Sequence, residues 1–179
     1  MSEYIPRLQE AIASAMRGMT REEMLREREG KWSIAQVLEH LYLSYMGTIK
    51  GCERVLHTEK PLATSQTPAQ WLKTLLIIAF GHFPQGIEAP RQVRPKGIPV
   101  DQVVSDMQRQ IAVMEESLTR CERQLGNHKK LFNHPVLGPL TGEQWRKLHW
   151  LHGRHHVRQI LHLRKQYAEK EKAPAAAGA

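Results

Sequence analysis

Histidines gather in one short stretch near the C-terminal end of the chain. Four of the ten histidines fall within the eight residues from His149 to His156. Residues three, four and seven apart share one face of an α-helix, so His149, His152 and His156 would lie in one row. The same row continues with three residues that are expected to face a core: Trp145, Ile160 and Leu163. The spacing therefore predicts imidazoles that point into the protein.

Histidines on an inward face have two interpretations. A single one is more often a core side chain that is satisfied by one hydrogen bond. Two or three in register favour a metal site, because neutral imidazole is the commonest side-chain ligand of first-row metals and a His-x-x-x-His pair converges on one ion. A pair alone makes a weak site, so a third ligand is expected from another element.

The composition indicates a chain that folds around one substantial core. Of its 179 residues, 41% are hydrophobic, which fits a single domain over residues 1–170. Residues 171–179 contain Pro174 and an Ala/Gly-rich end with nothing to bury, so they are expected to be disordered. The two cysteines, Cys52 and Cys121, form no C-x-x-C pair, so neither a disulfide framework nor a thiolate zinc site is indicated.

The net charge of +8 could indicate a nucleic-acid partner. The basic residues are scattered along the chain and aromatic content is only 6%, so a solvated basic surface is favoured and no nucleic-acid partner is expected. The N-terminus lacks the pattern of a signal peptide, and the longest apolar run, 75–80, is far shorter than the ~20 residues that span a bilayer. We therefore expect a soluble, cytoplasmic protein with no membrane segment.

Capping boxes mark the expected helix starts, because each joins a Ser or Thr N-cap to a Glu or Gln three residues later. Four of them begin at Thr20, Ser33, Thr67 and Thr141. Apolar periodicity predicts helices over about 5–19, 33–55, 67–80, 101–125 and 141–168, with a short helical turn after Thr20. The Pro- and Gly-rich segments 81–99 and 127–140 are expected to be irregular.

This pattern of long amphipathic helices, with no strand-like alternation and no internal repeat, predicts an all-α bundle. In the last helix the charged residues are expected to lie mostly opposite the histidine row: Arg146, Lys147, Arg154, Arg158 and Lys165. The segment 67–80 is apolar nearly all round. One face of the bundle can bury only part of this apolar surface, so the rest is expected to be buried elsewhere. A two-fold homodimer is the expected solution.

Two segments of the chain resemble the DinB/YfiT-like superfamily of metalloenzymes. Residues 32–41, WSIAQVLEHL, are similar to its W-S-x-x-x-x-x-x-H-L signature, and residues 152–159, HGRHHVRQ, are similar to its H-x-x-H-H-x-x-Q segment. Residues 133–141 together with Trp145 resemble a branch whose function is unassigned. The resemblance covers nearly the whole chain in element order, and implies a DinB/YfiT-like four-helix bundle with an extra short helix in a long crossover.

The resemblance also implies a set of metal ligands: His40, His152 and His156. In the superfamily, the histidine late in the W-S helix and the outer pair of H-x-x-H-H bind one divalent metal, usually zinc or nickel. Helical phase alone puts His40 on the shoulder of its apolar stripe and would not select it. The resemblance assigns no ligand role to His149 or His155, and the sequence leaves open whether either joins the site. Many members have H-H-R-G-Q where this chain has residues 155–159, HHVRQ, so no role of that Arg-Gly pair is carried over.

Three histidines with an open position are the arrangement of a catalytic zinc site. Such a neutral shell leaves the charge of the ion to act on the fourth ligand, which lowers the pKa of a bound water to about 7 or holds a thiol as thiolate. Relatives in the superfamily include thiol-dependent S-transferases and a mycothiol-dependent isomerase. The resemblance therefore implies a metal-dependent thiol S-transferase or hydrolase acting on a small molecule, with a low-molecular-weight thiol as a candidate cosubstrate.

Two alternatives remain open at the level of sequence. One is a stress-associated dimer that binds metal or another ligand without turnover, and the other is a structural dimer whose histidines form only a polar core network. Three residues are weaker candidates for groups that support the ligands: Glu39, Gln159 and His134. For each of these, a surface or capping role is the competing interpretation.

Overall fold

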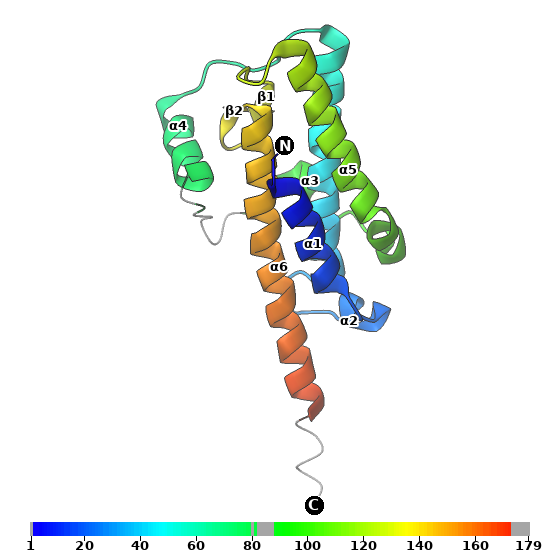
Figure 1. Cartoon of the computed structure of the whole chain (residues 1–179). Coiled ribbons are helices and arrows are strands. Elements are labelled where there is room, and N and C mark those ends of the chain that lie inside the picture. Colours follow the sequence, from blue (N-terminus) through cyan, green and yellow to red (C-terminus); the bar gives the residue numbers. More distant parts are fainter. Residues whose placement is uncertain (1, 80, 82–87, 173–179) are drawn as a thin grey trace, which may run out of the picture.

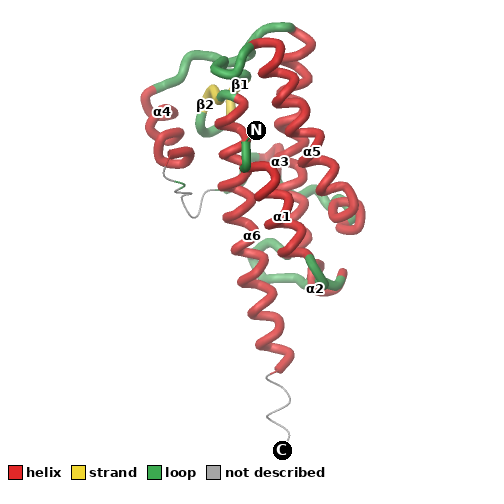
Figure 2. Tube along the Cα trace, in the orientation of Figure 1, coloured by secondary structure: helices red, strands yellow, loops and turns green. Residues whose placement is uncertain are grey.

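The structure, a computed structural model, describes residues 2–79, 81 and 88–172. The described chain is mostly helical (Figure 2), which confirms the expected all-α class at this level. Its long helices are α1 (Tyr4–Met16), α3 (Ile34–Thr58), α5 (Val100–Leu125) and α6 (Gly142–Lys172). Residues 171 and 172, which the sequence predicts to be disordered, belong to the end of α6, and the rest of the predicted tail, 173–179, lies outside the described residues.

The shorter elements connect and flank these helices: α2 (Arg21–Leu25), α4 (Pro68–Thr74), a π-helical turn (Leu75–Ala79) and a 3-10 turn (Arg91–Val93). All four predicted capping boxes form, with the N-cap hydroxyl and the Glu or Gln side chain each bonded to the other residue's backbone N–H. Within the described chain, none of the helices combines the length and apolar character that crossing a membrane requires.

One continuous cluster of buried apolar side chains joins the four long helices. In Figure 1, α3 runs beside α5, and α1 lies along α6, which is the longest helix. Gly153 permits the close approach of α1, because a Cβ at that position would overlap the side chain of Leu8. Burying a Leu or Ile side chain contributes about 1.5–3 kcal/mol, so the stripes predicted from the sequence provide the main force that assembles the helices.

The segment 127–140 is not wholly irregular, contrary to prediction. It contains a short antiparallel hairpin of β1 (Phe132–His134) and β2 (Gly138–Leu140). His134 closes its turn, since its Nδ1 accepts the backbone N–H groups of Val136 and Leu137, each at 3.2 Å. Strands of three residues are too short to show an alternating pattern, which explains why the sequence did not reveal them.

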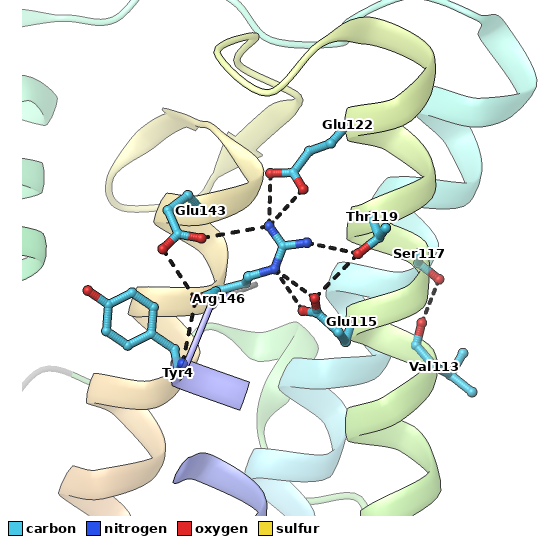
Figure 3. A network of polar contacts seen from close by, with 9 residues as sticks. Tyr4, Val113, Glu115, Ser117, Thr119, Glu122, Glu143 and Arg146 are labelled. Carbon is cyan, nitrogen blue, oxygen red and sulfur yellow. Dashed lines mark hydrogen bonds and ion pairs between the residues drawn. The ribbon is translucent and has the colours of Figure 1, made fainter. Parts of the chain in front are cut away.

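Arg146 is buried between α6 and α5 rather than solvated, which corrects the expectation for that face of the last helix. Its side chain is only 5% exposed, and its guanidinium donates to Glu115 at 2.7 Å and to Glu122 at 2.8 Å (Figure 3). It also donates to the Thr119 hydroxyl at 3.0 Å. The carboxylates of α5 supply the opposite charge, so this Arg146 network holds α5 in register against α6.

The apolar segment after Thr67 is partly covered. Ile77 and Ile78 are buried, whereas four neighbouring side chains are exposed: Trp71 (58%), Leu72 (50%), Leu75 (38%) and Leu76 (43%). In Figure 1, α4 lies apart from α1 and α5; it contacts β2, and the π-helical turn that follows it contacts α6. The predicted surplus of apolar surface is therefore present, and the homodimer expected to cover it stays a prediction.

Candidate metal centre

Three histidines from two helices meet at one point. His40 comes from α3, and His152 and His156 lie four residues apart on one face of α6. The Nε2 atom of His152 is 3.0 Å from that of His40 and 3.1 Å from that of His156. Within the described residues, this is the group of three or more His, Cys, Asp or Glu side chains whose ligand atoms converge, all within 4.8 Å of one another. The structure thus brings together the three residues that the resemblance implies.

His40 is buried although helical phase places it beside the apolar stripe of α3. It is only 4% exposed, because the crossover segment 88–98 covers that flank of the helix. The ring of Trp32, just before the helix, packs against it with ring centroids 5.1 Å apart. Helical phase describes which side faces the bundle, and it carries no information about a loop that returns to cover another side.

The outer nitrogens of two of these rings are fixed by oxygen acceptors. His40 Nδ1 lies 2.8 Å from the carbonyl oxygen of Val93, and His156 Nδ1 lies 3.0 Å from Oε1 of Gln159. Since these oxygens can only accept, each neutral ring carries its hydrogen on Nδ1 and its lone pair on Nε2. This is the tautomer that presents Nε2 to a metal, and such acceptors commonly orient metal-binding histidines.

The convergent Nε2 atoms are not satisfied by one another. With the lone pairs of His40 and His156 both turned inward, a single hydrogen on Nε2 of His152 fully satisfies at most one of its two short contacts. The lone pair on the other ring is then left without a hydrogen, so the two acceptor atoms, Nε2 of His40 and Nε2 of His156, compete for one donor. A cation placed among the three nitrogens would relieve this conflict, and the donor set of three imidazoles suits zinc, nickel or copper rather than magnesium or calcium.

Burial keeps the three imidazoles in the neutral, ligating form. It lowers the pKa of His40 from its usual value, and it lowers the pKa of His156 to about 3, with the neighbouring His40 acting in the same direction. The pKa of His152 is lowered well below its usual value by burial and by the histidines on either side. At neutral pH the three rings are therefore uncharged, which is the form of imidazole that binds a metal.

The other two histidines of the row have different surroundings. His149 is buried, and its Nε2 lies 2.8 Å from the hydroxyl of Thr48 rather than among the converging atoms. Burial lowers its pKa to about 3. His155 is exposed and contacts the ring of His156 edge-on, with centroids 5.0 Å apart. Neither belongs to the convergent group of the described chain.

The three weaker candidates have three different roles. Gln159 contacts His156 directly, and Glu39 is buried with its carboxylate on the backbone of the crossover segment. His134 lies outside the convergent group and closes the hairpin turn instead. Sequence reasoning did not find Val93, because its contribution is a backbone carbonyl that no side-chain pattern signals.

The fold and the site define a mostly helical protein in which three neutral histidines from two helices converge. Comparison with family profiles matches residues 2–162 to the family described as "Protein of unknown function (DUF1569)", and the chain belongs to that family. The match includes all three convergent histidines. No curated protein and no solved structure matches the chain.

Proposed function

We propose that the protein binds one divalent metal ion, zinc or nickel, through His40, His152 and His156. The observation that supports this most directly is the convergence of three Nε2 atoms within 4.8 Å, two of them from rings whose Nδ1 is held by an oxygen acceptor. We further propose that the helices form a bundle of the DinB/YfiT-like kind, in keeping with the WS…HL and HxxHHxxQ segments of the sequence.

The proposed activity is that of a metal-dependent thiol S-transferase or hydrolase acting on a small molecule. The ion, when bound, supplies Lewis-acid activation to a water or a low-molecular-weight thiol. The protein contributes three neutral donors on two helices and no fourth ligand atom from the described residues, which leaves room for an exogenous ligand. His152 and His156 are only partly buried, and we propose that a small molecule reaches the ion from their side of the site.

Metal binding is tested first by competition titration of zinc against a chromophoric chelator, using protein without a His tag. The variants His40→Ala, His152→Ala and His156→Ala should each lose most of the bound metal. The matched controls His149→Ala and His155→Ala remove histidines of the same helix and should retain it. An equal loss of metal from His149→Ala would contradict the proposed ligand set.

Catalysis is tested separately, with zinc-loaded or nickel-loaded protein offered a small thiol and an electrophilic acceptor. The rate should rise between roughly pH 6 and 8, as the activated group loses its proton, and a chelator should abolish it. An identical rate in the apo and metal-loaded forms would contradict a catalytic role for the three histidines.

The second candidate function is a stress-associated dimer that binds metal or another ligand without turnover. The exposed apolar side chains around α4, led by Trp71 and Leu72, favour an assembly of this kind. A protein that binds zinc tightly and dimerises, but shows no metal-dependent rate with any thiol and acceptor pair, would support this alternative over the enzyme.

A further inference from the structure

The residue before His40 has an unusual set of contacts for a helix side chain. Glu39 is only 3% exposed, and its carboxylate accepts three consecutive backbone N–H groups of the crossover segment. These are the N–H groups of Lys96 at 2.6 Å, Gly97 at 3.2 Å and Ile98 at 3.2 Å. Hydrogen bonds to an ionised acceptor are about twice as strong as neutral ones, so this is a firm attachment between α3 and the segment.

The backbone of the segment is shaped to make this contact. Gly97 has φ +88, a left-handed conformation that glycine adopts without the steric cost of a Cβ. Such a turn allows successive N–H groups to form a concave site for an anionic group. In this chain the anionic group is the carboxylate of Glu39, so its oxygens are already occupied by hydrogen-bond donors.

The same segment also reaches the metal centre. Val93, three residues before Lys96, presents its carbonyl oxygen to His40 Nδ1 at 2.8 Å. Pro95 lies between the two attachments and restricts the backbone that joins them. Two consecutive residues of α3, Glu39 and His40, therefore hold one short segment at two points. Loss of the hydrogen bonds between Glu39 and residues 96–98 would let the carbonyl of Val93 move away from the ring of His40.

We propose that Glu39 is a positioning residue of the metal centre. Its carboxylate anchors residues 96–98, the anchored segment holds the carbonyl of Val93 against His40, and that carbonyl fixes the tautomer and direction of the ring. This inference rests on the proposed binding of metal by His40, His152 and His156. Because coupling between two sites is reciprocal, metal bound at His40 should in turn stabilise the segment.

The first test is the zinc affinity of Glu39→Gln, measured by competition titration. The amide keeps the size of the side chain, but it has one acceptor oxygen in place of two and its NH₂ faces backbone donors. We expect zinc to bind about 10–100-fold more weakly, the usual effect of losing a group that orients a ligand. The matched control is Glu122→Gln, which removes another largely buried carboxylate, in the Arg146 network, and should lower stability without changing zinc affinity.

A second variant leaves the carboxylate in place. Gly97→Ala has open space for the added Cβ but strains a backbone with φ +88, so it should weaken zinc binding in the same direction by a smaller factor. This variant keeps the proposal testable if Glu39→Gln does not fold.

Amide hydrogen exchange of the full-length protein separates positioning from simple structural support. Zinc should slow exchange in peptides covering residues 91–98 of the wild type, and this slowing should be lost in Glu39→Gln. A wild type that binds zinc without any change in that segment, or a Glu39→Gln variant of undiminished zinc affinity, would overturn the inference. A wild type that binds no zinc would instead overturn the metal proposal on which it rests.

Discussion

Two polar clusters lie along α6, and they are completed in different ways. In the Arg146 network, one cation donates to the carboxylates of Glu115 and Glu122 and to the hydroxyl of Thr119. In the histidine cluster, three groups of the same kind present their Nε2 atoms to one another, with contacts of 3.0 and 3.1 Å. The first cluster pairs donors with acceptors and opposite charges. The second gathers more lone pairs than its own hydrogens can satisfy.

The difference separates a structural cluster from a candidate functional one. Buried polar groups in folded proteins are nearly always paired, so convergent lone pairs that share at most one hydrogen among the three Nε2 atoms favour a cation bound between them. Buried charge in the Arg146 network has its partner within the chain. We therefore attribute the register of α5 against α6 to the Arg146 network, and ligand binding to the histidine cluster. Substitutions in the first should change stability, and substitutions in the second should change metal affinity.

The largest effect on stability is expected from Arg146→Ala. It leaves the carboxylates of Glu115 and Glu122 without their buried cation, and breaking a buried pair in this way costs about 3–5 kcal/mol. Urea denaturation should detect the loss, while zinc affinity of the folded fraction should stay unchanged. The control Arg17→Ala removes a solvent-exposed ion pair of 3.8 Å and should cost under about 1 kcal/mol. Loss of zinc binding in Arg146→Ala would break the division between the clusters.

A smaller effect depends on pH and concerns His149. Burial lowers its pKa to about 3 in the folded protein, whereas the unfolded chain binds a proton near pH 6.5. The folded protein therefore has its full stability with respect to His149 above about pH 6.5. As pH falls from about 6.5 toward 3, the free energy of unfolding decreases by up to about 1.4 kcal/mol per pH unit, because the unfolded chain binds a proton that the folded protein does not.

The change His149→Gln keeps a group that can bond to Thr48 but does not titrate. Urea denaturation of metal-free protein should show the stability of wild type relative to this variant falling by about 2 kcal/mol between pH 7 and pH 5. The matched variant His128→Gln replaces an exposed histidine. A difference between wild type and His149→Gln that does not vary with pH would contradict a buried, neutral His149.

Gln159→Leu should change the affinity of the histidine cluster for zinc without changing the Arg146 network. It removes the acceptor of His156 Nδ1, which holds the ring's lone pair on Nε2. Zinc should bind about 10–100-fold more weakly, as measured by competition titration, with little change in the free energy of unfolding. Gln124→Leu, at an exposed position of α5, is the matched control. Unchanged zinc affinity in Gln159→Leu would show that the contact does not orient the ring.

The smallest effect on either cluster is expected from breaking the predicted homodimer. Light scattering at micromolar concentration should report a dimer for the wild type and a monomer after Trp71→Glu, since Trp71 is the most exposed of the apolar side chains around α4. Zinc affinity should be the same in both proteins because the three histidines belong to one chain. A wild type that is strictly monomeric would contradict the assembly.

Local signals in the sequence were sufficient for the helices and for part of the site. The capping boxes at Ser33 and Thr141 place the starts of α3 and α6, and the four-residue spacing of His152 and His156 puts both on one face. Both features depend only on neighbours along the chain. The DinB/YfiT-like resemblance that added His40 is not tested by the family match and stays a prediction.

The remaining features depend on segments that are distant in the sequence. Arg146 is buried only because α5 brings Glu115 and Glu122 to its flank, and His40 is buried only because the crossover segment covers it. The acceptor from Val93 is a backbone atom and has no signature in the sequence. Tertiary packing decides all of these, and periodicity along one helix does not report it.

The most direct test of the account is X-ray absorption at the zinc edge, on untagged protein loaded with equimolar zinc. A site formed by His40, His152 and His156 should give a spectrum dominated by imidazole nitrogens at about 2.0–2.1 Å, with three imidazoles in the wild type and fewer in His152→Ala. A spectrum of hydrated zinc, or one with sulfur at about 2.3 Å from Cys52 or Cys121, would contradict it.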